Sequence, residues 1–232
     1  MTRCVLFDFD GTLIDTWRLY LEAFRRSLAP HFNRLLSDAE ILEYQPSAER
    51  RMLQRLLEEA DFPGYFESFL SHYRALHASH NDGLYPGVHE MLKDLRAQGY
   101  GLGVITGKSR AAWDLTFAAS GLEPFDVVIT DDDVTDPKPH PEGLLAALQT
   151  FPFDPLDGVY VGDSLLDCQA AKAAGIPFMA ALWSKTGQEL NTFKLAVTQL
   201  GAKEFLPHPS MLAIRLQAEP RYDLAQRGTA YE

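Results

Sequence analysis

The chain has 232 residues, 46% of them apolar, with a formal net charge of −11 and a pI near 5.1. This length supports one full hydrophobic core and a smaller second domain. The negative charge argues against nucleic-acid and anionic-membrane partners, because both require clustered Lys and Arg. The sequence has no leader-like start and no apolar run long enough to span a membrane, so we expect a cytoplasmic protein. Cys4 and Cys168 are too few for a disulfide framework and read as small buried hydrophobes.

The first predicted element is a buried strand over residues 4–7, which leads directly into Asp8, Asp10 and a glycine turn. In open α/β sheets the functional site lies beyond the carboxyl ends of the strands, so both carboxylates are expected at that edge. Two close carboxylates repel each other unless a divalent metal or a shared proton joins them. Taken alone, the stretch also fits an ordinary acidic turn.

Residues 16–81 contain almost no alternating apolar pattern and several segments with helical spacing. They therefore predict a helical cap inserted after the first strand. The expected helix breaks are Pro30, Pro46 and the pair Pro63-Gly64. The expected helices cover residues 17–28, 37–43, 47–60 and 65–77.

From residue 82 onward, strands and helices alternate, which is typical of a parallel sheet covered on both faces. The predicted fold class is α/β: a Rossmann-like doubly wound core of residues 1–15 and 82–218, with the inserted cap and a poorly packed tail at 219–232. The later predicted strands are 101–106, 125–130, 158–162, 176–181 and 203–206. The predicted helices are 88–98, 109–120, 141–150, 165–174, 188–200 and 209–217.

Three later strand ends carry groups that could serve the carboxylates of the first. Thr106 and Gly107 follow one strand and could form an anion cradle at a helix start. Lys138 lies between two prolines, which suits a fixed charge beside a phosphoryl group. Asp163 and Asp167 follow another strand about one helical turn apart, and Asp163 is either a metal ligand or a plain helix N-cap.

Together these strand ends resemble the four motifs of the haloacid dehalogenase-like hydrolase superfamily, at residues 8–12, Thr106, Lys138 and residues 162–167. The helical insert resembles the C1 cap of that family, and the chain is most similar to its phosphoglycolate phosphatase-like branch. The resemblance implies a Mg²⁺-dependent phosphatase, active on a phosphoglycolate-like compound or a sugar phosphate through an aspartyl-phosphate. A monomer and a homodimer are both compatible with it.

The resemblance also implies a role for each carboxylate. Asp8 would be the nucleophile, and Asp10 would be the general acid and then the general base. Mg²⁺ would be held by the carboxylates of Asp8 and Asp163 and by the backbone carbonyl of Asp10.

The remaining motif residues would bind the phosphoryl group. Thr106 and the N–H of Gly107 would contact its oxygens, and Lys138 would offset its negative charge. Asp167 would orient Lys138 or a metal-bound water. In the cap, Arg50 could grip a carboxylate or a second phosphate of the substrate, or could simply lie on a solvated helix face.

Two other functions stay open at this point. The acid at Asp10 favours phosphoryl transfer over dehalogenation, but a phosphosugar mutase of the β-phosphoglucomutase type would use the same motifs. A non-catalytic binding protein of the same fold is a third hypothesis, and the intact Asp8, Asp10, Lys138 and Asp163 argue against it.

Overall fold

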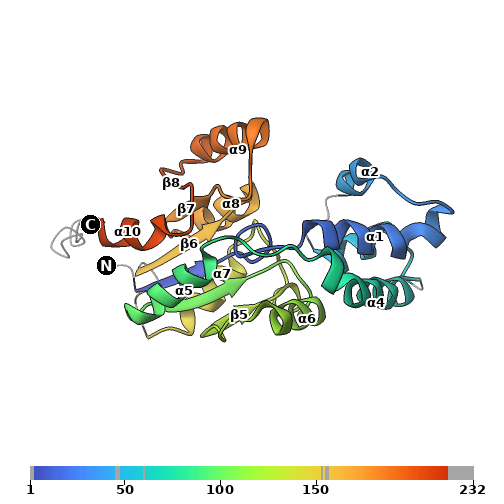
Figure 1. Ribbon diagram of the computed structural model, residues 1–232, viewed down its shortest axis with the longest axis horizontal. Helices are drawn as coiled ribbons and strands as arrows, with labels where there is room; N and C mark the ends of the chain where they lie inside the picture. The colour runs from blue at the N-terminus through green and yellow to red at the C-terminus, as the bar shows by residue number, and fades with distance from the viewer. Residues whose placement is uncertain (1–2, 45–47, 60, 153, 155–156, 219–232) are drawn as a thin grey trace, which may run out of the picture.

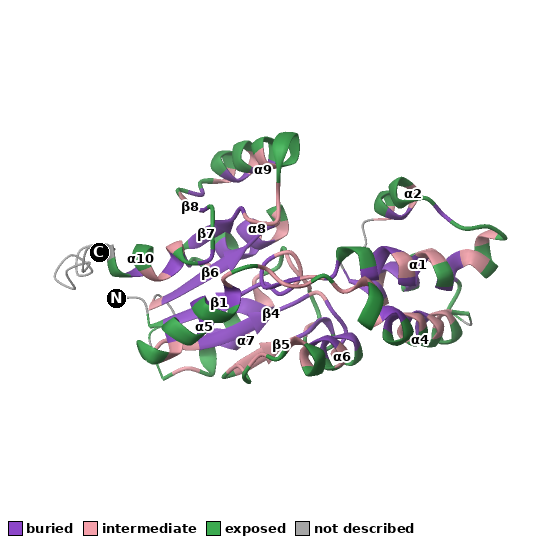
Figure 2. Ribbon diagram, in the orientation of Figure 1, coloured by how far each residue is buried: buried purple, intermediate pink, exposed green. Residues whose placement is uncertain are grey.

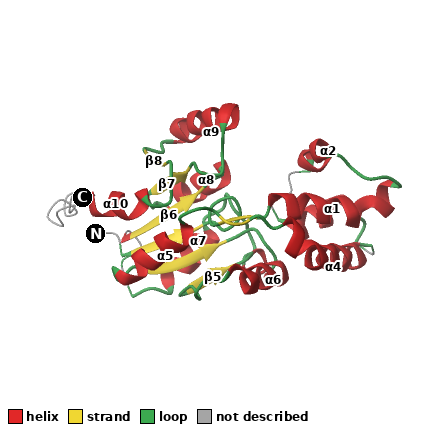
Figure 3. Cartoon of the chain, in the orientation of Figure 1, coloured by secondary structure: helices red, strands yellow, loops and turns green. Residues whose placement is uncertain are grey.

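The computed structural model describes residues 3–44, 48–59, 61–152, 154 and 157–218. Its centre is a six-stranded parallel sheet with the order β5-β4-β1-β6-β7-β8. The strands are β1 (Cys4–Phe7), β4 (Gly101–Ile105), β5 (Val127–Ile129), β6 (Gly158–Gly162), β7 (Phe178–Ala181) and β8 (Glu204–Leu206). Helices lie on both faces of the sheet (Figure 3), which confirms the predicted α/β class and the doubly wound core.

Alternate side chains of each strand point to opposite faces and build two hydrophobic clusters. Val5 and Phe7 belong to one cluster, and Cys4 and Leu6 belong to the other. The helices over the first face are α5 (Val88–Ala97), α6 (Arg110–Ser120) and α10 (Met211–Ala218), and those over the second are α7 (Glu142–Gln149), α8 (Leu165–Ala174) and α9 (Gly187–Leu200). The central strands β4, β1, β6 and β7 are therefore buried on both sides (Figure 2), which explains their continuous apolar sequence, whereas the edge strands β5 and β8 are partly exposed.

Four helices form a separate lobe beside the sheet (Figure 1), with its own hydrophobic cluster. They are α1 (Trp17–Phe32), α2 (Asp38–Glu43), α3 (Glu49–Leu56) and α4 (Phe62–His80), and together we call them the cap lobe. Aromatic rings fill its interior, and those of Phe24 and Phe69 lie 4.6 Å apart. The insert is helical, as predicted, and its limits at residues 16 and 81 stay a prediction.

Two of the predicted helix breaks are wrong. Helix α1 continues through Pro30, because this proline lies in the last turn and interrupts only the end of the helix. Asn33, in the left-handed conformation, ends it instead. Pro63 lies in the first turn of α4, where a missing N–H removes no helical hydrogen bond. The third predicted break, Pro46, and the tail at 219–232 lie outside the described residues.

A short antiparallel ribbon connects the cap lobe to the core. It consists of β2 (Ile14–Asp15) and β3 (Gly83–Leu84), in which Ile14 pairs with Leu84 and Asp15 with Gly83. The sequence analysis did not predict it, because two residues are too few to show a periodic pattern. The chain therefore enters and leaves the cap lobe at one place.

Two expectations from composition can be compared with the structure. Cys4 and Cys168 are buried and unbonded, so both act as small apolar residues, as predicted. None of the described helices combines the length and the apolar composition that a membrane span requires.

Candidate active site

The candidate site lies at the carboxyl end of β1, where the chain order of the sheet reverses. Strands β4 and β6 flank β1, and Phe7 is in register with Val104 on one side and Val161 on the other. Their carboxyl ends therefore meet at one edge. The structure brings together there three of the predicted strand ends, which carry Asp8, Thr106 and Asp163.

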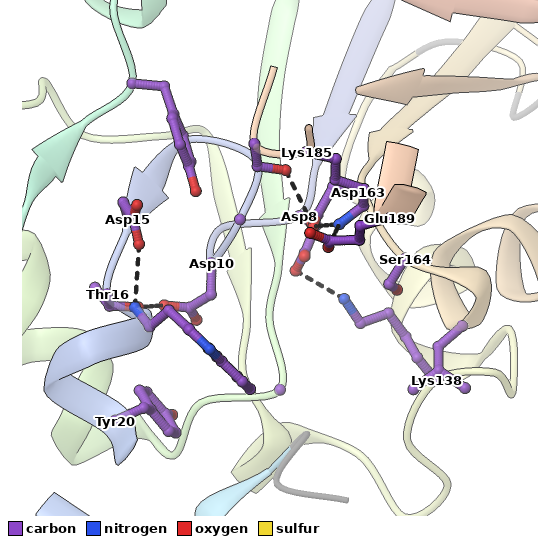
Figure 4. Close-up of a pocket in the computed structure, with 16 residues that line it drawn as sticks. Asp8, Asp10, Asp15, Thr16, Tyr20, Lys138, Asp163, Ser164, Lys185 and Glu189 are labelled. Carbon is purple, nitrogen blue, oxygen red and sulfur yellow. Dashed lines mark hydrogen bonds and ion pairs between the residues drawn. The ribbon is translucent and has the colours of Figure 1, made fainter. Parts of the chain in front are cut away.

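Asp8 forms an ion pair with Lys138, which reaches the site from the loop after β5 (Figure 4). The Nζ atom of Lys138 lies 2.8 Å from Asp8 Oδ1 and 2.8 Å from Asp167 Oδ1, and it donates to the hydroxyl of Tyr160 at 3.2 Å. Burial lowers the pKa of Lys138, but the carboxylates of Asp167 and Asp8 raise it well above its usual value. Lys138 is therefore a fixed cation between two carboxylates.

The carboxylates of this edge carry more negative charge than their lysines balance. Burial raises the pKa of Asp8, and so do the carboxylates of Asp167 and Asp163, against the opposing effect of Lys138. Burial likewise raises the pKa of Asp163. A cation placed between Asp8 and Asp163 would favour the ionised form of both.

The donor set at this edge fits a divalent metal. Carboxylate oxygens of Asp8, Asp163 and Asp167 lie within 4.8 Å of one another. Asp167 is already engaged by side-chain hydrogen bonds, so Asp8 and Asp163 are the two that line the pocket. The backbone at Gly11 passes so close that a Cβ there would lie 2.5 Å from Asp163 Oδ2. Oxygen ligands of this kind are those that Mg²⁺ prefers.

Lys185 is a further cation of the site that the sequence analysis missed. Its Nζ atom lies 2.8 Å from Asp163 Oδ2 and 3.5 Å from Glu189 Oε1, and its side chain lines the same pocket (Figure 4). No motif marks this lysine. The available signal was its position shortly after β7, because the loop there leaves the sheet at the same edge.

Asp10 points away from Asp8 and toward the cap lobe (Figure 4). Its Oδ1 atom forms an ion pair with Lys108 at 2.8 Å and accepts a hydrogen bond from the hydroxyl of Thr16. Its Oδ2 atom accepts from the hydroxyl of Thr106 at 3.4 Å. The two carboxylates of the first motif are thus held by different partners, and the side chain of Asp10, which is 31% exposed, lines the pocket.

The remaining predicted substrate-binding residues are Thr106, Gly107 and Arg50, and only one of them lines this pocket. Thr106 is buried, and its hydroxyl accepts the backbone N–H of Lys108 at 3.2 Å. Gly107 lines the pocket. Arg50 does not line it, because its guanidinium reaches the core instead and pairs with Asp132, with Nε 2.9 Å from Oδ1.

The pocket has a volume of about 430 Å³ and lies between the core loops and the cap lobe. Thr16, Trp17 and Tyr20 at the start of α1 line it opposite Asp8 and Lys138. This volume lies within the usual range of small-molecule sites, and both carboxylates and ammonium groups line the cavity.

Known proteins resemble this chain in sequence or in fold. A family model described as haloacid dehalogenase-like hydrolase matches residues 5–181. Pyrophosphatase PpaX of Bacillus anthracis is 33% identical over 195 residues, which cover 82% of this chain and 88% of that protein. CbbY from Rhodobacter sphaeroides, solved in complex with phosphate, has a TM-score of 0.74 and 25% identity over 91% of this chain and 96% of its own. A predicted phosphoglycolate phosphatase from Haemophilus somnus shares the fold, with a TM-score of 0.77 and 22% identity over 93% and 98% of the two chains.

Proposed function

The chain belongs to the haloacid dehalogenase-like hydrolase family, as a hydrolase of the phosphatase kind, and we propose that it hydrolyses a small phosphorylated metabolite with the help of Mg²⁺. The observation that supports this most is the arrangement of Asp8, Lys138 and Asp163. It combines a carboxylate nucleophile, a fixed cation and a site for a divalent ion at one end of the pocket. The proposed substrates are a phosphoglycolate-like compound or a sugar phosphate.

The first step transfers the phosphoryl group to Asp8. A carboxylate oxygen of Asp8 attacks phosphorus, and the bond from phosphorus to the leaving oxygen breaks. Asp10 gives its carboxyl proton to that oxygen. Oδ1 of Asp10 is engaged by Lys108 and Thr16, whereas Oδ2 accepts only the longer hydrogen bond from Thr106, so Oδ2 is the oxygen that carries the transferred proton.

The second step releases phosphate. The carboxylate of Asp10 takes a proton from a water molecule whose oxygen attacks phosphorus, and the bond between phosphorus and Asp8 breaks. Inorganic phosphate leaves, Asp8 is again a carboxylate, and Asp10 is again protonated. One residue therefore serves as acid and then as base.

The remaining residues bind the phosphoryl group and the metal. Lys138 stays beside Asp8 throughout, and the backbone N–H of Gly107 is the proposed donor to a phosphoryl oxygen. Asp8, Asp163 and the backbone carbonyl of Asp10 would hold Mg²⁺. When bound, the ion supplies positive charge that offsets the charge on the phosphoryl oxygens.

Inorganic pyrophosphate is a second candidate substrate. The relative PpaX is named a pyrophosphatase. Lys185 also gives the pocket a second ammonium group besides Lys138, which suits a substrate with two phosphoryl groups. Pyrophosphate therefore belongs in the first substrate panel.

The experiment that tests the function is phosphate release with Mg²⁺ from pyrophosphate, 2-phosphoglycolate and hexose 1- and 6-phosphates, with Asp8→Asn as the blank. We expect release from at least one substrate, and loss of it in excess chelator. A folded wild-type protein that releases no more phosphate than Asp8→Asn would favour the non-catalytic binding protein instead. Conversion of a hexose 1-phosphate to the 6-phosphate, in place of free sugar, would identify a mutase.

A further inference from the structure

Lys108 is a fully buried lysine at the contact between the core and the cap lobe. Its side chain has an exposed fraction of 0%. Its backbone belongs to the core, because its N–H donates to Thr106 Oγ1 at 3.2 Å and its carbonyl accepts the N–H of Asp131 at 2.9 Å. Its ammonium group, by contrast, extends among side chains of the cap lobe. A buried ammonium has three N–H donors to satisfy, so its neighbours must supply the acceptors.

The ammonium of Lys108 has one partner in the core and the others in the cap lobe, as far as the described residues show. The core partner is Asp10, whose Oδ1 atom lies 2.8 Å from Nζ. The hydroxyl of Tyr73 accepts a hydrogen bond at 3.0 Å. The ring centroids of Tyr20 and Tyr73 lie 4.1 Å and 5.1 Å from Nζ, within the range of cation–π attraction.

The two tyrosines are themselves fixed across the same contact. The hydroxyl of Tyr20 donates to Glu49 Oε2 at 2.6 Å, and Glu49 Oε1 accepts the backbone N–H of Ser109 in the core at 2.7 Å. The hydroxyl of Tyr73 lies 2.7 Å from Thr116 Oγ1 on α6. The rings therefore take up these positions around Lys108 only when the cap lobe is packed on the core.

We infer that Lys108 is a positioning residue that holds the carboxylate of Asp10 for proton transfer and makes this hold depend on the cap lobe. The inference rests on the proposed function, in which Asp10 is the general acid. Lys108 does not line the pocket, so it acts on the substrate only through Asp10. Without its ammonium, Oδ1 of Asp10 would keep only the hydroxyl of Thr16, and the carboxyl group would lose its fixed orientation.

A role in orienting Asp10 can be detected by comparing substrates with different leaving groups. An alkoxide needs a proton to leave, whereas p-nitrophenolate leaves without one. A defect in the orientation of Asp10 should therefore slow hydrolysis of an alkyl phosphate and spare that of p-nitrophenyl phosphate. A merely structural defect at the contact would slow both alike.

The first test is Lys108→Met, which keeps the length of the side chain and removes its charge. For the best alkyl phosphate of the panel we expect kcat to fall by about 10-fold to 100-fold, and for p-nitrophenyl phosphate by less than about threefold, because general acid catalysis acts on the first alone. KM should change little for either substrate. Lys93→Met, on the exposed face of α5, is the matched control and should behave as wild type.

The second test is Tyr73→Phe, which removes a hydroxyl that touches neither Asp10 nor the pocket. We expect the same selective loss at a smaller scale, about threefold to 10-fold, since one of several contacts to Lys108 is removed. The double variant should be no slower than Lys108→Met alone, because both changes act through one residue. This variant also decides the question if Lys108→Met does not fold, which thermal unfolding will show.

Several results would overturn the inference. Equal losses for both substrates, a change confined to KM, or additive effects of the two substitutions would each show that Lys108 only joins the cap lobe to the core. A wild-type protein that hydrolyses neither substrate would instead overturn the proposed function, and the inference with it. The two failures are therefore distinguishable by the wild-type rates.

Discussion

Two lysines pair with the carboxylates of the first motif, one fully buried and one largely buried, and their surroundings differ. Lys138 is held between the carboxylates of Asp8, which follows β1, and Asp167, in the first turn of α8, so all three groups belong to the core. Lys108 has a single carboxylate partner, Asp10, and is otherwise enclosed by aromatic rings of the cap lobe. The first arrangement is complete within the core, whereas the second exists only when the two parts are packed together. The nucleophile is thus set by one part of the molecule and the acid by both.

The largest expected effect is on activity, and it concerns Asp8, the carboxylate that pairs with Lys138. Asp8→Asn removes the attacking carboxylate, so the rate of phosphate release should fall by about 10³-fold or more for every substrate, whatever its leaving group. Steady-state phosphate release from an alkyl phosphate and from p-nitrophenyl phosphate measures it. Asp94→Asn, on the exposed face of α5, is the control and should keep wild-type rates. Residual activity that depends on the leaving group would contradict the assignment of Asp8 as nucleophile.

The next effect concerns stability. Lys138→Met leaves two buried carboxylates without their cation, so we expect a loss of about 3 to 5 kcal/mol in the free energy of unfolding. Lys108→Met leaves only Asp10, which is partly exposed, and should cost about 1 to 2 kcal/mol. Urea denaturation without added metal measures both. Equal losses would mean that the aromatic enclosure of Lys108 contributes as much as the second carboxylate of Lys138.

A smaller effect is expected at Lys185, which lines the pocket together with Lys138. The ammonium of Lys185 occupies Oδ2 of Asp163, and a divalent ion would compete with it for that oxygen. Lys185→Met should therefore raise the affinity for Mg²⁺ by about threefold to 10-fold, the equivalent of one partly buried ion pair. Titration calorimetry with Mg²⁺ alone measures it. Glu189→Gln is the control, because it leaves Lys185 on Asp163; unchanged affinity in Lys185→Met would show that the two cations do not compete.

The smallest effect is an expected constancy with pH. Burial lowers the pKa of Lys108, but Asp10, Tyr73 and Glu49 raise it above its usual value of 10.5. A raised lysine pKa adds stability below the usual value, which is lost only as the pH rises through the higher one. The difference in unfolding free energy between wild type and Lys108→Met should thus stay the same from about pH 7 to about pH 10. A difference that shrinks in this range would mean that the buried ammonium deprotonates early.

The core of the site could be predicted from the sequence because of how parallel sheets are built. Asp8, Thr106 and Asp163 each follow an apolar run directly, and the carboxyl ends of parallel strands meet at one edge. The position of each residue directly after a strand was therefore enough to predict that these side chains lie at one edge. Lys138 follows the next strand along the chain after that of Thr106, and the proline on each side of it indicated a stiff loop that suits a fixed charge.

The contact between core and cap lobe could not be predicted in this way. Tyr20, Glu49 and Tyr73 lie on three separate helices, and helical spacing shows which face is apolar without showing what it packs against. Arg50 illustrates the same gap. Its helix was foreseen, but its ion pair with Asp132 depends on how the cap lobe sits on the core.

The ribbon of β2 and β3 bears on how such a protein can diversify. Asp15 and Gly83 are paired in the ribbon, so a tight turn could join the two ends that would remain without the segment between them. The core, which carries the catalytic residues, and the cap lobe, which faces the substrate, could then have different evolutionary origins within one gene. Lys108 limits that freedom, because a transplanted module must bring its own enclosure for this ammonium. Compatibility between a new module and an old core would thus depend on Lys108 as well as on the ion pair of Arg50 with Asp132.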